Sequence, residues 1–139
     1  MQYKIPFSGR AHRYIKSEID TVVSVMQQAI PLTQGCYQQE FQKKFCRYID
    51  SKYAFALNNA TAGLELAAQL CQFEKGDEVI IPSHTYCASA IPFGRTGAKI
   101  VWADIDPETF VISPQDILKK LTPKTKMVVV VHLYGLPCD

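Results

Sequence analysis

The chain has 139 residues, of which 47% are hydrophobic and 20% charged, a balance typical of a soluble globular domain with its own core. Its formal net charge is only +2, and its lysines and arginines are dispersed. These values argue against nucleic acid or an anionic membrane surface as the main partner.

The cysteines and the apolar segments indicate the compartment. Five scattered cysteines include no close pair of the kind that binds zinc or forms a redox dithiol, so we expect no metal site. Cys46 and Cys71 fall on apolar helix faces and are interpreted as small core residues. Residues 1–6 lack the apolar core of a signal peptide, and the longest apolar run, 127–131, is far shorter than a membrane span. We therefore expect a cytoplasmic protein.

The first part of the chain shows two helical patterns. Apolar residues recur at helical spacing from Ile19 to Ile30 and stop at Pro31, while Ser17 and Asp20 have the spacing of a capping box. A second pattern places these apolar residues on one side: Phe41, Phe45, Tyr48 and Ile49. We predict an N-terminal helical segment over residues 1–52.

Residues 53–139 show alternating strand and helix patterns. The predicted strands cover 54–57, 78–82, 99–103 and 127–132, and the predicted helices cover 61–73, 85–95 and 114–121. Ser113, Pro114 and Asp116 have the order of an N-cap, a first-turn proline and a first-turn acid. This alternation predicts an α/β domain with a mostly parallel sheet, and the apolar run 127–131 predicts a strand buried on both faces.

A short polar turn at residues 58–61, Asn-Asn-Ala-Thr, lies between a predicted strand and a long amphipathic helix. The first N–H groups of a helix are free to bind an anion, so the turn is suited to a phosphate. The next strand ends at residues 83–86, Ser-His-Thr-Tyr, and both segments should meet at the carboxyl edge of the sheet. A phosphate site beside the flat ring of an aromatic residue suggests a cofactor, and because P-loop and Gly-x-Gly-x-x-Gly sequences are absent, a purine nucleotide bound through them is disfavoured.

Two other groups of polar residues are less specific. Asp104 and Asp106 could be paired carboxylates, but an aspartate before a proline more often begins a turn, and we favour the turn. His132 lies in an apolar strand and is interpreted as a core histidine. His84 could flank the cofactor or point away from it, and it is left without a role.

Four sequence blocks, at residues 57–64, 76–86, 104–107 and 131–135, resemble the DegT/DnrJ/EryC1/StrS family in their order and spacing. Its members are pyridoxal-phosphate sugar aminotransferases, and the resemblance extends from about Ile5 to Asp139. It implies part of the large domain of the PLP-dependent transferase fold type I, with pyridoxal 5'-phosphate (PLP) as cofactor. It also implies a nucleotide-linked keto sugar as substrate, glutamate as amino donor, and a homodimer or larger oligomer.

The resemblance also implies roles for three residues. Ala60 and Thr61 match the residues that hold the cofactor phosphate through backbone amides and a threonine hydroxyl, and Tyr86 matches the aromatic residue that stacks on the pyridine ring. The family more often has Ser-Gly-Thr where this chain has Asn-Ala-Thr, so an added methyl group alters the grip on the phosphate. From the residues alone, Thr61 could instead be a helix cap and Tyr86 a half-buried core tyrosine.

The residues that perform the chemistry in this family lie beyond Asp139. We therefore assign no catalytic residue, because the Schiff-base lysine and the acid that protonates the pyridine nitrogen have no match here. The predicted strand 54–57 would also lack its neighbour, so residues 53–139 are expected to be an incomplete α/β cofactor-binding domain from the N-terminal part of a longer enzyme. Two alternatives stay open: a catalytically silent fragment that acts in assembly or binds phosphate ligands weakly, and a PLP-dependent sugar dehydratase.

Overall fold

The structure is a computed structural model that describes residues 12–31 and 33–139. It divides into two units, Met1–Ala56 and Leu57–Asp139. The prediction about a signal peptide concerns residues 1–6, which lie outside the described residues. No helix in the described ranges is long and apolar enough to cross a membrane.

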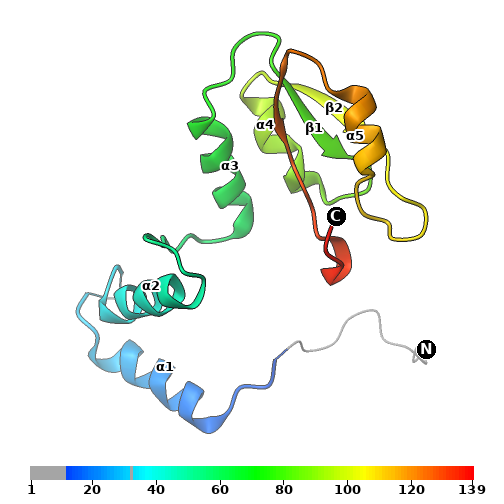
Figure 1. Cartoon of the computed structure of the whole chain (residues 1–139). Coiled ribbons are helices and arrows are strands. Elements are labelled where there is room, and N and C mark those ends of the chain that lie inside the picture. The colour runs from blue at the N-terminus through cyan, green and yellow to red at the C-terminus, as the bar shows by residue number, and fades with distance from the viewer. Residues whose placement is uncertain (1–11, 32) are drawn as a thin grey trace, which may run out of the picture. The chain divides into compact units, whose positions relative to one another are not determined.

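The first unit contains α1 (Lys16–Gln28) and α2 (Cys36–Tyr48), seen in Figure 1. The Glu18 carboxylate accepts a hydrogen bond from the N–H of Ile15 at 2.8 Å, and Ile15 is the N-cap. The capping box predicted at Ser17 and Asp20 is therefore wrong in position, because Glu18 provides the acidic partner. No residue of either helix is buried, and the apolar face of each is largely exposed.

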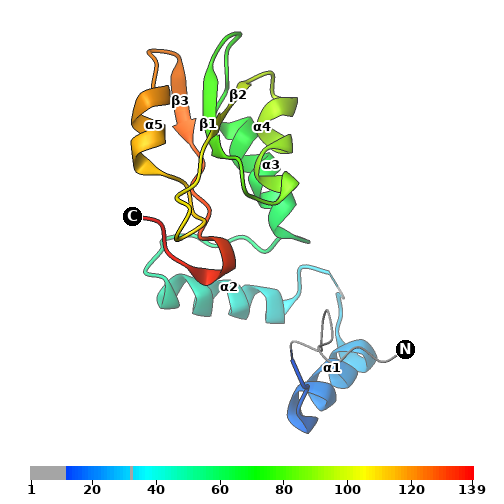
Figure 2. The same ribbon diagram turned by 90° about the vertical axis from the view of Figure 1, so that its right-hand side faces the viewer.

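The second unit is an α/β layer structure, as predicted. It contains α3 (Ala60–Leu70), β1 (Glu78–Pro82), η1 (Cys87–Ser89), α4 (Ile91–Arg95), β2 (Lys99–Ala103), α5 (Pro114–Lys120), β3 (Thr125–Val128) and η2 (Leu133–Gly135). The sheet has the order β2-β1-β3, and both strand pairs are parallel. Helices α3 and α4 cover one face and α5 the other (Figure 2).

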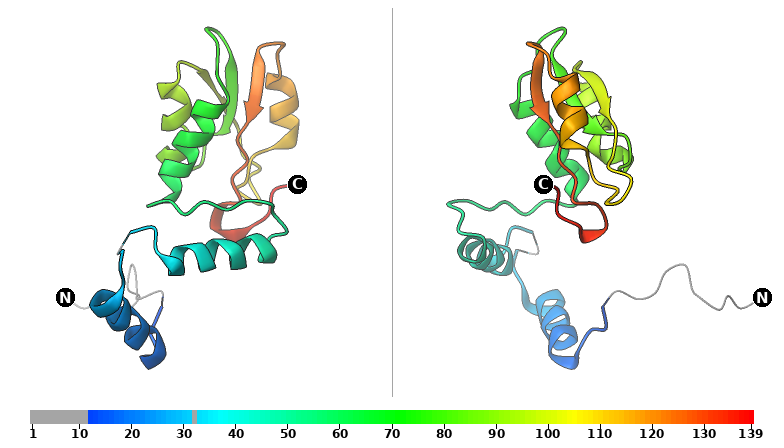
Figure 3. Two further views of the ribbon diagram at one scale, coloured as in Figure 1. Left: turned by 90° about the vertical axis from the view of Figure 1, so that its left-hand side faces the viewer. Right: turned by 45° about the vertical axis from the view of Figure 1, so that its right-hand side comes forward.

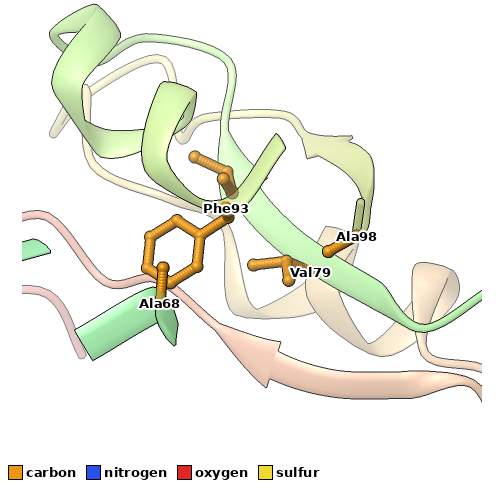
Figure 4. Close-up of a cluster of buried hydrophobic side chains, with 5 residues drawn as sticks. Ala68, Val79, Phe93 and Ala98 are labelled. Atoms are coloured by element: carbon orange, nitrogen blue, oxygen red, sulfur yellow. The ribbon is translucent and has the colours of Figure 1, made fainter. Parts of the chain in front are cut away.

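The core follows the two-residue repeat of β1, whose side chains point alternately to opposite faces. Val79 and Ile81 are fully buried on the side of α3 and α4, where they pack with Ala68 and Phe93 (Figure 4). Ile80 is fully buried on the side of α5. The central strand is therefore covered on both faces, and it anchors the sheet from whose strands the loops of the site extend.

Three predicted elements differ from the structure. Residues 54–57 form no strand, because no described strand lies beside them to accept their hydrogen bonds. The helix predicted over 85–95 is two pieces, since Pro92 is tolerated only in a first helical turn and the helix must restart at Ile91. Strand β3 ends at Val128 rather than at residue 132, and Val130 is 50% exposed, so the apolar run is not buried on both faces.

The five cysteines are free thiols. Cys46 is partly buried, but Cys71 is exposed at the end of α3. The interpretation of Cys71 as a core residue is wrong for this structure, because α3 turns only the side that carries Ala68 toward the sheet.

Candidate functional site

The N-terminus of α3 is organised by Asn59. The side-chain oxygen of Asn59 accepts a hydrogen bond from the N–H of Ala62 at 2.9 Å, which makes Asn59 the N-cap. Thr61 is the second residue of the helix and does not cap it, so the alternative role for Thr61 is excluded. The N–H groups of Ala60 and Thr61 have no helical carbonyl one turn earlier to bind and remain available to a ligand.

The hydroxyl of Thr61 is also available. It makes no hydrogen bond to any residue within the described part of the chain, although the side chain is partly buried. Two consecutive residues therefore provide two backbone N–H donors and one hydroxyl at the positive end of an 11-residue helix. This donor set fits a phosphate group, which accepts several hydrogen bonds and carries negative charge.

The segment that follows β1 is held in place by two contacts. The N–H of Ser83 donates to the carbonyl of Ala103 at 2.8 Å, and the hydroxyls of Thr85 and Ser89 are hydrogen-bonded at 2.8 Å. These contacts fix the backbone on both sides of Tyr86, which has an extended conformation and begins η1. The Tyr86 side chain is 73% exposed, so it is not the half-buried core tyrosine of the alternative interpretation.

The fold brings these segments to one end of the second unit. Strands β1 and β3 point toward the end at which α3 begins and η2 lies (Figures 1, 2 and 3). Helix α3 also packs against η1, the segment that Tyr86 begins. The carboxyl edge of the sheet, where open α/β sheets bind their ligands, therefore carries both predicted binding segments.

Three aromatic rings meet at the same edge. The imidazole of His84 lies 5.9 Å from the ring of Tyr134 and 6.4 Å from the ring of Phe110, measured between centroids, with edge-on geometry in both pairs. The three residues follow β1, β2 and β3 in turn. Sequence reasoning left His84 without a role and missed Phe110 and Tyr134, since no spacing within a single segment signals a contact among three loops.

The aspartates after β2 form a turn, as we favoured. One carboxylate oxygen of Asp106 accepts hydrogen bonds from the N–H groups of Thr109 and Glu108 and from the Thr109 hydroxyl. These bonds, led by the one from the Thr109 N–H, hold the pKa of Asp106 below its usual range. Within residues 12–31 and 33–139, no group of three or more His, Cys, Asp or Glu side chains is placed to hold a metal ion.

His132 is not a core residue. Its side chain is exposed, and its Nδ1 accepts a hydrogen bond from the N–H of Cys138 at 3.0 Å. The apolar strand that contains it in the sequence has ended at Val128, so its neighbours no longer enclose it. The prediction of a buried histidine is therefore wrong.

The fold is that of the PLP-dependent aminotransferases. The PLP-form of a putative sugar aminotransferase, Spr1654, from Streptococcus pneumoniae superposes with a TM-score of 0.87 at 34% identity. The match covers 99% of this chain and 34% of that chain. More narrowly, this chain belongs to the DegT/DnrJ/EryC1/StrS aminotransferase family, whose model matches residues 13–139.

Curated relatives in the same family are sugar-modifying enzymes. The GDP-perosamine synthase of Escherichia coli O157:H7 is 38% identical over 138 residues, which are 99% of this chain and 36% of that protein. The GDP-perosamine synthase of Caulobacter vibrioides is 40% identical over 132 residues, 95% of this chain and 36% of that protein. The chain thus spans about a third of the length of these relatives.

Proposed function

We propose that this chain forms the cofactor-holding part of a cytoplasmic PLP-dependent aminotransferase that acts on a nucleotide-linked keto sugar with glutamate as amino donor. Membership of the aminotransferase family and the names of the relatives support this reaction class. The observation that carries the proposal is the unused Thr61 hydroxyl beside the free N–H groups of Ala60 and Thr61. Asn59 caps the helix in place of Thr61 and so leaves this hydroxyl to the ligand.

In this proposal the phosphate of PLP lies at the N-terminus of α3. The N–H groups of Ala60 and Thr61 and the Thr61 hydroxyl donate to its oxygens, and the helix dipole favours its negative charge. Ala60 is the first residue of the helix, where any L-residue adopts the required backbone conformation. The methyl group of Ala60, which glycine lacks, therefore occupies space near the phosphate but leaves the N–H of Ala60 available as a donor.

Tyr86 is proposed to lie flat against the pyridine ring. Its largely exposed ring offers a face to a planar ligand, and the bonds made by Ser83 and by the Thr85–Ser89 pair hold its backbone. Stacking of this kind orients a ring without requiring a charge on the protein. The two contacts together would fix the cofactor at its phosphate and along its ring.

When bound, PLP supplies an electron sink for the electron pair released at the carbon that carries the amino group. We propose that the lysine and the acidic residue needed for this chemistry lie outside these 139 residues and that the complete enzyme is a homodimer or larger oligomer. Residues 53–139 would then bind the cofactor, residues 1–52 would precede this domain as a helical segment, and the chain alone would be catalytically silent. The dehydratase alternative differs at the position of that lysine and stays a prediction.

The proposal is tested by comparing the affinities of pyridoxine 5'-phosphate and pyridoxine for the 139-residue chain by calorimetry. Neither ligand has an aldehyde, so nonspecific reaction with surface lysines is avoided. We expect the phosphate to improve affinity about tenfold or more, and Thr61→Val to remove most of that gain. Thr61→Ser, which keeps the hydroxyl, should retain it.

Thr21→Val is the matched control, because Thr21 lies within α1 and its hydroxyl donates to the carbonyl of Ser17. This change should leave both affinities as they are in the unmodified chain. Equal affinities for the two ligands, or a Thr61→Val chain that keeps the full phosphate gain, would contradict the proposal.

A further inference from the structure

The aromatic cluster of His84, Phe110 and Tyr134 has no part in holding the cofactor phosphate. Its rings come from the loops that follow β1, β2 and β3, so three separate segments contribute to one surface at the carboxyl edge. Under the proposed function this edge also receives the substrate, because the reacting sugar carbon must approach the cofactor. The cluster is thus placed where the sugar would lie.

Two of the three residues adopt a backbone conformation that is rare for bulky side chains. Phe110 has a φ of 60° and Tyr134 a φ of 56°, both in the left-handed region. Such strain persists where the surrounding structure holds it, and it is concentrated at functional sites. Here both strained residues direct their rings against the same imidazole.

Hydrogen bonds hold the two strained turns. The N–H of Phe110 donates to the carbonyl of Asp106 at 2.8 Å, and the Asp106 carboxylate binds the residues between them. The turn around Tyr134 is closed by the N–H of Gly135, which donates to the carbonyl of His132 at 3.3 Å. The orientation of the rings is therefore built into the loops.

Much of the aromatic surface of the cluster is accessible to a ligand. Tyr134 is 83% exposed and Phe110 is 50% exposed, while His84 is partly buried between them. An open aromatic face beside a phenol hydroxyl suits a pyranose ring, which has apolar C–H groups on one face and hydroxyls around its rim. The cluster contains no lysine or arginine, the side chains that bind phosphates and carboxylates most strongly, so it is better suited to a sugar than to a diphosphate or a carboxylate.

We propose that the exposed ring of Tyr134 is a binding subsite for the apolar face of the substrate's sugar ring and that His84 positions it. This inference rests on the proposed function, since it takes the sugar of a nucleotide sugar as the ligand. Phe110 makes a second edge-on contact with His84. The hydroxyl of Tyr134 contributes less than its ring, because contact with C–H groups requires only the aromatic face.

The subsite is tested by saturation-transfer NMR on the 139-residue chain with GDP-mannose as the probe. We expect the sugar protons of one pyranose face to receive strong saturation. Tyr134→Leu should reduce that transfer about fivefold, whereas Tyr134→Phe should preserve it. Tyr48→Leu is the matched control, since Tyr48 is 87% exposed on α2 and should not affect the transfer.

The positioning role of His84 has its own readout. His84→Ala should weaken saturation of the sugar protons and remove the nuclear Overhauser contacts to the Tyr134 ring, while His84→Phe should restore both without changing the melting temperature. Saturation confined to the guanine and ribose protons would mean that the cluster binds the nucleobase, which would overturn the proposal. So would a Tyr134→Leu chain with unchanged transfer.

The same sample separates this inference from the proposed function. If pyridoxine 5'-phosphate binds through Thr61 but the sugar protons receive no saturation, only the subsite is wrong. If the sugar protons are saturated through Tyr134 but pyridoxine 5'-phosphate binds no more tightly than pyridoxine, the proposed phosphate site at Thr61 is wrong and the sugar subsite is supported. If neither ligand binds, both proposals fail.

Discussion

The carboxylate of Glu78 accepts a hydrogen bond from the Nζ of Lys99 at 2.8 Å, and these two residues are paired in register at the amino ends of β1 and β2. Its second oxygen accepts from the hydroxyl of Thr122 at 2.7 Å, just before β3. Glu78 is only 6% exposed. One buried carboxylate therefore joins the segments that begin all three strands, at the end of the sheet opposite the candidate site.

Glu78 gives the first prediction, on the pH dependence of stability. Its hydrogen bonds from Lys99 and then from Thr122 lower its pKa in the folded chain. The stabilisation is therefore complete above the pKa of an unfolded glutamate, about 4.3, and is lost as the pH falls through the lower folded value. Glu78→Gln should lower the melting temperature at pH 7, and this difference should shrink steadily at acidic pH.

The comparison with the variant isolates Glu78 from other carboxylates. Hydrogen bonds from the backbone of Thr109 and of Asp104 also lower the pKa values of Asp106 and Asp116, so the unmodified chain loses stability in acid for several reasons. Glu108→Gln, on the exposed loop after β2, is the control and should have the same melting temperature as the unmodified chain. A Glu78→Gln deficit that is the same at pH 7 and in acid would contradict this account.

The second prediction concerns the core. Ile80 is fully buried on the central strand and packs with Ala103 and Ile112. Ile80→Ala should lower the free energy of unfolding by about 2–5 kcal/mol in urea denaturation, because it removes buried methyl groups and leaves a cavity. Leu118→Ala, which truncates a 70% exposed side chain on α5, should change it by less than about 0.5 kcal/mol. Similar losses in the two variants would show that β1 is not the centre of the core.

The third prediction separates capping from ligand binding at α3. Asn59→Asp keeps an N-cap acceptor for the N–H of Ala62 but adds a negative charge at the proposed phosphate site. We expect this variant to melt near the unmodified chain and to bind pyridoxine 5'-phosphate less tightly. Asn59→Ala should instead lower the free energy of unfolding by about 1 kcal/mol. Unchanged affinity of the Asn59→Asp chain for the phosphate would place the ligand elsewhere.

The fourth prediction distinguishes the ring contact from the phosphate contact. Tyr86→Leu should weaken binding of pyridoxine and of pyridoxine 5'-phosphate by a similar factor, because Tyr86 is proposed to touch only the ring they share. Thr61→Val should weaken only the phosphate form. Calorimetric titration of both variants with both ligands gives the four affinities. A Tyr86→Leu effect limited to the phosphate form would contradict the assigned contact.

The sequence predicts the parts of this fold that depend on local patterns. The composition of residues 78–82 predicts a strand with the bounds that β1 has, and the order of Ser113, Pro114 and Asp116 predicts the start of α5, where the Ser113 hydroxyl accepts from the N–H of Asp116. The turn before α3 is likewise a local signal. These features were predicted because each is determined within a few residues.

The features that sequence reasoning missed depend on distant partners. Residues 54–57 have a strand's composition, but a strand requires a neighbour that the described chain does not provide. The meeting of His84 with Phe110 and Tyr134 depends on the sheet order, which local patterns do not specify. The choice of Asn59 over Thr61 as N-cap was open because asparagine and threonine are both good N-cap residues and these two are only two positions apart.

The central claim, that the N-terminus of α3 holds the cofactor phosphate, is tested most directly by following the backbone amides of an isotope-labelled chain by NMR during titration with pyridoxine 5'-phosphate. We predict that the amide signals of Ala60 and Thr61 shift more than any others and that pyridoxine without the phosphate leaves them in place. Unchanged signals at these two residues, with the largest shifts among the exposed lysines of residues 119–126, would contradict the claim.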